Sequence, residues 1–158
     1  MIRDAVVEDA ENLTSIAFAA KRFWNYPEDY LQLWKDELTI TTDYIKYNFV
    51  RVYLADNKVV GFYSCFKLEE QIKFSSGYME SGDWLDHMFI YPEYHKRGIG
   101  TQMFEDIKLN IKSNNLFCPI RIFVDPNAVG FYDKMGAKSF RMSGSSIPGR
   151  EIPVYIYA

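Results

Sequence analysis

Residues 95–101 read His-Lys-Arg-Gly-Ile-Gly-Thr, and they tell more about this chain than any other stretch. They follow a strand-like run at 84–91 and open a segment with apolar residues every four positions, at Ile99, Met103, Ile107 and Ile111. That spacing predicts an amphipathic helix. Glycine lets a ligand approach the backbone, and the first turn of a helix leaves N–H groups unpaired. With two cations just before it, the stretch predicts an anion site suited to a pyrophosphate.

Two familiar phosphate-binding motifs do not fit this stretch. A dinucleotide-binding fingerprint needs a third glycine three residues after Gly100, where Met103 stands instead. A Walker A loop needs Gly-Lys-Ser/Thr, which is absent. On these residues alone, an ordinary glycine turn with solvated charges is the competing interpretation.

Composition restricts the class of protein. The chain has 158 residues, 48% of them apolar and 25% charged, as expected for one globular domain spanning residues 1–158. No apolar run is long enough to cross a bilayer, and no signal peptide is apparent, so we expect a cytoplasmic protein without a membrane partner. The net charge of −3 argues against nucleic acid as a partner. The two histidines lack metal-ligand pair spacing, so no metal is expected.

The order of predicted elements indicates an α/β (α+β) fold. Helices are expected at residues 7–21, 28–35, 42–47, 98–115 and 128–135. Strands are expected at 1–3, 50–55, 59–68 (with a possible bulge at Gly61), 84–91, 120–124, 138–142 and 152–157. Residues 69–83 are expected to be at least partly loop. The strand-helix-strand unit in the middle favours a parallel pair, and the hairpins favour antiparallel neighbours. The prediction is therefore a mixed, mostly antiparallel sheet with helices on its faces.

Two segments together resemble the GNAT superfamily of acyl-CoA-dependent N-acyltransferases. The first is the loop at 95–101, which corresponds to the family's Gln/Arg-x-x-Gly-x-Gly/Ala motif, with His95 at the Gln/Arg position. The second is residues 127–137, Asn-Ala-Val-Gly-Phe-Tyr-Asp-Lys-Met-Gly-Ala, which is similar to a downstream segment of the family almost position for position. The resemblance covers nearly the whole chain and implies a twisted sheet of about six to seven strands flanked by about four helices.

The resemblance also implies acetyl-CoA as the co-substrate. The cofactor-binding residues it implies are Met88, Phe89 and Ile90 for the pantetheine arm, His95, Lys96, Arg97, Gly98, Ile99, Gly100 and Thr101 for the pyrophosphate, and Asn127 and Phe131 near the thioester. Tyr132 matches the tyrosine that commonly protonates the departing thiolate. A phenol directed at sulfur is suited to that proton transfer.

The general base is less determined by the sequence. The family often has a glutamate near the start of the central strand, and Trp84 stands there instead. Asp83, Asp86 and His87 are the nearby candidates, with a water chain as a further option. An imidazole titrates near neutral pH, and strand alternation puts Asp86 and His87 on opposite faces.

The acceptor side is predicted from loop residues. Trp24 and Tyr26 lie between the first two helices, and Arg150 lies between the last two strands. We interpret the protein as an N-acetyltransferase that acts on a small-molecule amine or on a protein or peptide amine, with a homodimer possible. One rival is a degenerate CoA-binding module with a sensing or regulatory role. The other is a nucleotide-binding α/β module unrelated to acyl transfer.

Overall fold

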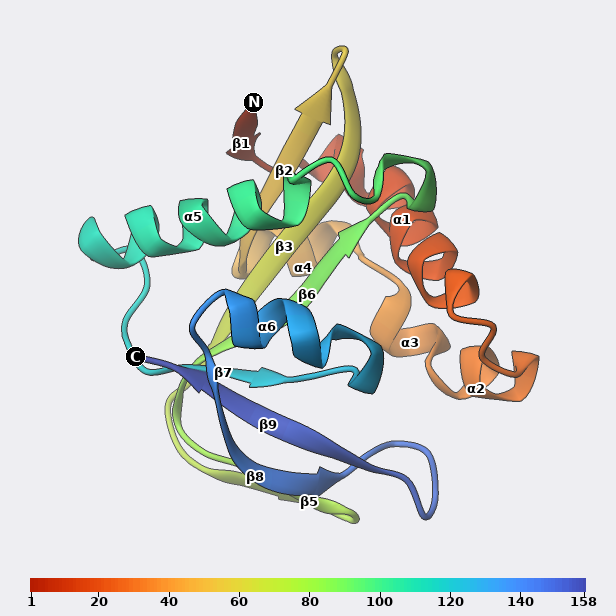
Figure 1. Ribbon diagram of the computed structural model, residues 1–158, viewed down its shortest axis with the longest axis vertical. Coiled ribbons are helices and arrows are strands. Elements are labelled where there is room, and N and C mark those ends of the chain that lie inside the picture. The colour runs from red at the N-terminus through yellow and green to blue at the C-terminus, as the bar shows by residue number, and fades with distance from the viewer. The chain divides into compact units, whose positions relative to one another are not determined.

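A computed structural model describes residues 1–158 of the chain (Figure 1). Seven strands hydrogen-bond in the order β1-β2-β3-β6-β7-β9-β8, and β4 and β5 form a separate pair. The strands are β1 Ile2–Asp4, β2 Phe49–Ala55, β3 Lys58–Leu68, β4 Ile72–Phe74, β5 Gly77–Met79, β6 Gly82–Ile90, β7 Ile120–Phe123, β8 Lys138–Gly144 and β9 Glu151–Tyr157. The α-helices are α1 Ala10–Phe23, α2 Glu28–Leu33, α3 Lys35–Leu38, α4 Thr42–Tyr47, α5 Ile99–Lys112 and α6 Val129–Lys134.

This arrangement confirms the predicted mixed, mostly antiparallel sheet. Strand β6 pairs with β7 in parallel, as the strand-helix-strand unit predicts, and the hairpin strands β2–β3 and β8–β9 pair antiparallel. There are more helices than expected, because the stretch after α1 forms three short helices where the sequence predicts two. Trp34 ends α2 and precedes α3, and Thr41 caps α4 by accepting a hydrogen bond from the Tyr44 amide at 3.0 Å. Two short strands, β4 and β5, lie within the segment 69–83.

The chain forms two compact units, residues 1–65 with 87–106 and residues 66–86 with 107–158. In the first unit, β1, β2 and β3 are consecutive antiparallel neighbours. Tyr53 pairs with Gly61 and Leu54 with Val59, so Val60 is the extra residue of a bulge beside the predicted Gly61. A Cβ atom at Gly61 would lie 3.1 Å from the Phe89 carbonyl oxygen, so glycine here permits β6 to approach closely.

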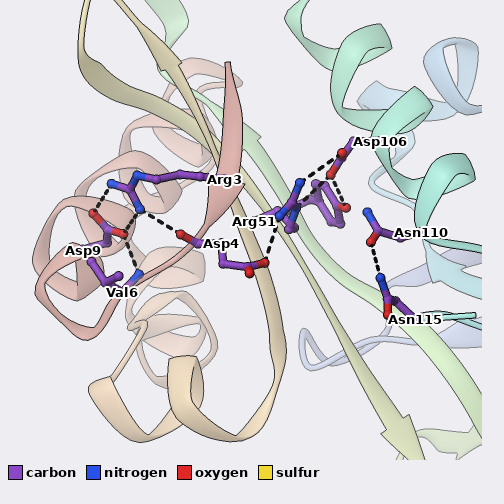
Figure 2. Close-up of polar contacts among 9 residues, drawn as sticks. Arg3, Asp4, Val6, Asp9, Arg51, Asp106, Asn110 and Asn115 are labelled. Atoms are coloured by element: carbon purple, nitrogen blue, oxygen red, sulfur yellow. Dashed lines mark hydrogen bonds and ion pairs between the residues drawn. The ribbon is translucent and has the colours of Figure 1, made fainter. Parts of the chain in front are cut away.

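A polar network in the first unit holds the middle of α5 against strands β2 and β3 (Figure 2). Arg51 on β2 donates to both carboxylate oxygens of Asp106 on α5, at 3.0 and 3.2 Å, and to Asp4 on β1 at 2.9 Å. The Tyr63 hydroxyl also donates to Asp106, at 2.8 Å. Burial and this hydrogen bond raise the pKa of Tyr63 well above its ordinary value, so the phenol stays protonated and acts as a donor. The network therefore anchors the helix that follows the glycine loop.

The second unit has its own core and its own ion pairs. Its largest fully buried side chain is Trp84, whose ring stacks on Phe123 with centroids 4.8 Å apart. Arg141 donates to both Glu80 oxygens, at 2.6 and 3.2 Å, and the Arg121 Nε lies 3.8 Å from the same carboxylate. These groups join β8 and β7 to the segment that leads into β6.

Candidate active site

Strand β6 carries the candidate bases, and its side chains differ sharply in exposure. Asp86 is exposed, whereas His87 is 8% exposed, as the predicted alternation requires. The His87 imidazole lies among three rings, with centroid distances of 5.6 Å to Phe89, 5.8 Å to Tyr44 and 6.0 Å to Phe62. A histidine so enclosed is oriented by packing, which suits a group that must accept a proton at a fixed point.

A pair of hydroxyl groups accompanies this imidazole. The Tyr44 hydroxyl of α4 and the Ser64 Oγ of β3 are 2.8 Å apart, and Ser64 is fully buried. The hydrogen bond gives the buried Ser64 hydroxyl a polar partner. The sequence does not predict either residue as part of the site, since nothing in the local sequence distinguishes them from ordinary helix and strand residues.

The other candidates at the start of β6 have structural partners. Trp84 is 1% exposed, and its Nε1 donates to the Glu80 carbonyl at 2.9 Å. Asp83 is 6% exposed and accepts a hydrogen bond from the Phe117 amide at 2.7 Å. Burial opposes ionisation of Glu80, but hydrogen bonds from Arg141 outweigh it and lower the pKa of this carboxyl below its ordinary value. A carboxylate with a lowered pKa and a bidentate arginine is a weak base, so Glu80 does not replace the missing glutamate.

The glycine loop has the backbone conformation of an anion-binding turn. Lys96 and Gly98 both have positive φ, at 60° and 77°, and α5 begins at Ile99. A Cβ atom added at Gly98 would meet nothing within 4 Å, so the space in front of this residue is open. The Gln102 amide is the first of the helix to reach back, donating to the Gly98 carbonyl at 3.0 Å. The amides of the first turn are thus available to a ligand.

The charged side chains of the loop lie at its surface. Lys96 and Arg97 are exposed, and the Arg97 guanidinium lies 5.0 Å from the Tyr94 ring centroid. His95 is different, because its Nε2 lies 3.1 Å from the Ile90 carbonyl oxygen and its ring packs edge-on against Phe23 at 4.9 Å. The imidazole at the Gln/Arg position therefore ties the loop back to the end of β6.

The second motif folds as a capped turn and a short helix in the other unit. Asp125 accepts hydrogen bonds from the amide and the side chain of Asn127, at 2.9 and 3.1 Å, and Asn127 is exposed. Tyr132 is 7% exposed, and its ring contacts Phe131 edge-on at 5.1 Å. Gly136 ends the helix with a φ of 93°, as expected for its C-terminal cap.

The predicted acceptor residues differ in their surroundings. Trp24 is 44% exposed and contacts Phe23 edge-on at 4.9 Å. Tyr26 is half-buried and packs against Tyr30 and Trp34, at centroid distances of 6.1 and 5.0 Å. In the second unit, Arg150 borders a hollow with Ser76, Gly144 and Ser145.

The first unit brings together most of the predicted site. It contains Trp24, Tyr26, His87, the backbone of 88–90 and the loop 95–101, and two contacts link these segments: Phe23 with His95, and Lys21 with Phe89. Asp86, Asn127, Phe131, Tyr132 and Arg150 belong to the second unit. Lys21 and Trp34 are not among the predicted site residues, although each lies beside the predicted residue Tyr26.

The fold class is α/β, with a mixed sheet and a glycine loop that follows the central strand β6 and leads into α5. The sequence model of a protein family, the acetyltransferase (GNAT) domain, matches residues 46–136, which is more than half of the chain. The protein therefore belongs to the GNAT acetyltransferase family, which confirms the predicted resemblance. A comparison with curated proteins finds no match.

Solved structures show the same fold. A PaiA N-acetyltransferase from Thermoplasma acidophilum in complex with coenzyme A is 20% identical, with a TM-score of 0.71, over 98% of this chain and 96% of that one. A GCN5-related N-acetyltransferase from Rhodopseudomonas palustris is 18% identical, with a TM-score of 0.76, over 99% and 92%. A GNAT acetyltransferase from Brucella melitensis in complex with acetyl-CoA is 17% identical, with a TM-score of 0.63, over 100% and 95%.

The structure contains neither a metal cluster nor a membrane-spanning helix. No group of three or more His, Cys, Asp or Glu side chains is arranged to hold a metal ion. None of the helices combines the length and apolar character that a membrane-spanning segment needs.

Proposed function

We propose that this protein is an acetyl-CoA-dependent N-acetyltransferase that transfers the acetyl group directly to a primary amine in a ternary complex. The acceptor is a small-molecule amine or an amine of a protein or peptide. The observation that carries the proposal is the loop at 95–101, which has left-handed backbone at Lys96 and Gly98 and leads into the first turn of α5. Together with family membership, this geometry fits a pyrophosphate-bearing donor.

The residues of the loop fit the donor in shape and charge. The open space at Gly98 admits a phosphate next to the backbone, and the exposed Lys96 and Arg97 add attraction. The amides of residues 96–101 bind the pyrophosphate, and the backbone of 88–90 pairs with the pantetheine arm as an added strand. Asn127 and Phe131 orient the donor. Acetyl-CoA supplies an acyl group on a good leaving group.

Two side chains handle the protons. His87 accepts the proton that the amine must lose, and Tyr132 donates one to the departing thiolate. Asp86 is the second candidate for the base, since it is exposed on the same strand. A thiol intermediate is not part of the proposal, because Cys65 is buried and both Cys65 and Cys118 lie outside the two motifs.

A second candidate function is a CoA-binding module that does not turn over. The observation in its favour is Trp84, which fills the position of the family's glutamate and is locked to the Glu80 carbonyl. In that case the protein binds acetyl-CoA and releases no thiol with any amine. The third interpretation, a nucleotide-binding α/β module unrelated to acyl transfer, is not retained, because the chain belongs to the GNAT family.

Thiol release from acetyl-CoA with a panel of amines tests the proposal. We expect turnover with at least one amine, and Tyr132→Phe should lower kcat by about 10²–10⁴-fold with acetyl-CoA affinity nearly unchanged. Tyr47→Phe is the matched control, because Tyr47 is 80% exposed and lies outside both motifs. Turnover that Tyr132→Phe leaves intact removes Tyr132 from the mechanism. Binding of acetyl-CoA without turnover by the wild type favours the second candidate.

A further inference from the structure

One cationic side chain of the first unit lies among aromatic rings. The Lys21 Nζ, at the last turn of α1, is 4.7 Å from the ring centroid of Trp34, 5.6 Å from that of Tyr26 and 5.9 Å from that of Phe89. These three rings come from the end of α2, the loop after α1 and strand β6. We call Tyr26, Trp34 and Phe89 the aromatic cage.

Each side of the cage has its own packing partners. Tyr26 meets Trp34 edge-on at 5.0 Å, and Tyr30 contacts both, at 6.1 and 5.6 Å. Trp34 is 4% exposed. Phe89 contacts Phe62 at 6.0 Å and His87 at 5.6 Å instead. Each ring is therefore held by neighbours other than the lysine.

Rings grouped around an ammonium are a recognised way of binding organic cations. The negative faces of Trp, Tyr and Phe attract a cation within about 6 Å of the ring centroid. The lysine side chain is a flexible four-carbon stem, so its charged end can leave such a site while α1 stays in place. Lys21 is only partly buried, so part of its side chain is exposed to solvent.

The position of the cage relates it to the proposed reaction. Phe89 belongs to the stretch of β6 expected to bind the pantetheine arm, and its ring is 5.6 Å from the His87 imidazole. Residues 87 and 89 share one face of the strand. A cation in the cage is therefore separated by one ring from the candidate base.

We propose that the aromatic cage binds the alkylammonium group of the amine acceptor, and that Lys21 occupies this site in the free protein. The inference rests on the proposed function and adds the chemical class of the acceptor, an alkylammonium ion with an aliphatic body. The acceptor displaces the Lys21 ammonium, and the cage then selects cationic over neutral ligands.

Titration with n-butylammonium chloride, followed by ligand-observed NMR at constant ionic strength, tests this proposal. Lys21→Met keeps an apolar stem and removes the competing charge, so it should bind the probe about tenfold more tightly than the wild type, which is about 1.4 kcal/mol. Lys35→Met is the matched control, because Lys35 is an exposed lysine next to Trp34, and it should bind as the wild type does. Neutral 1-butanol should bind to none of them.

A second variant connects the binding to the rings. Tyr26→Leu, combined with Lys21→Met, should remove most of the gain, because one face of the cage is lost. Lys21→Gln repeats the test if the methionine variant does not fold. Equal affinity of wild type and both Lys21 variants overturns the proposal, as does a Lys21 variant that loses stability and binds no probe. An unchanged affinity after Tyr26→Leu also overturns it.

The outcome is separable from that of the proposed function. The same samples are heated with and without acetyl-CoA. Stabilisation by acetyl-CoA without the butylammonium effect shows that the cage proposal is wrong while the donor assignment stands. Absence of stabilisation by acetyl-CoA contradicts the proposed function whatever the cage binds.

Discussion

The two ends of strand β6 have different tasks. At its beginning, Asp83 and Trp84 are buried and hydrogen-bonded to main-chain groups of Phe117 and Glu80. Toward its end, His87 and Phe89 lie among aromatic rings that include Tyr44, whose hydroxyl is paired with Ser64, and a cationic lysine lies near Phe89. The first end is built for stability and the second has groups suited to proton transfer and cation binding. The comparison teaches that a missing family glutamate does not by itself mean a missing base.

The largest expected effect comes from the second end. His87→Gln should lower kcat/KM by about 10²–10⁴-fold and flatten the acidic limb of its pH profile, because the protonated imidazole can no longer be what limits the rate. Asp86→Asn is the matched control on the same strand and should leave that limb in place. If the two variants exchange these behaviours, Asp86 is the base. If neither changes the limb, a water chain takes the proton.

The next effect concerns the first end. Trp84→Ala should destabilise the protein by about 3–5 kcal/mol, since it removes a fully buried indole and leaves a cavity. Trp84→Phe keeps most of the side-chain volume but loses the hydrogen bond to the Glu80 carbonyl, so it should lower the free energy of unfolding by about 1 kcal/mol. Unfolding in urea measures both. A Trp84→Phe variant that keeps its stability but loses turnover would contradict this division, because it would give the beginning of β6 a catalytic role.

A smaller effect is expected at the loop after α1. Trp24→Ala should raise KM for the acceptor by about 10–150-fold, which corresponds to burying a ring contact worth roughly 1.5–3 kcal/mol. The melting temperature should hardly change, because Trp24 is 44% exposed. Tyr47→Ala is the control and should change neither quantity, because Tyr47 is 80% exposed and lies outside the predicted acceptor site. If Trp24→Ala instead lowers the melting temperature and leaves the acceptor KM unchanged, Trp24 is a packing residue.

The sequence predicts those parts of the molecule that depend on local patterns. The loop at 95–101 and the cap at Gly136 follow from glycine positions, and the bulge beside Gly61 from one glycine in a strand. The family motifs locate the expected donor site. The division of residues 28–47 into three helices is not predicted in full. Trp34 ends α2 and directly precedes α3, and Thr41 caps α4 a few residues later.

The surroundings of the candidate base could not be predicted in the same way. Tyr44 and Phe62 meet His87 only because α4, β3 and β6 pack together, and these are far apart in sequence. The grouping of Lys21 with Trp34 and Phe89 likewise depends on three separate elements. The Nε2 contact of His95 with the Ile90 carbonyl is local, because the two residues are five positions apart in the chain.

The proposed function depends on the binding of acetyl-CoA by this chain, and thermal unfolding with added ligand measures that binding. At 100 times Kd, a ligand specific for the folded state adds about 2.7 kcal/mol, and each kcal/mol raises the melting temperature of a chain of this size by about 2–4 °C. We expect acetyl-CoA to raise the melting temperature by about 5–10 °C and ATP at the same concentration to leave it unchanged. No shift at millimolar acetyl-CoA, or an equal shift with ATP, would show that the chain is not an acetyl-CoA-binding protein.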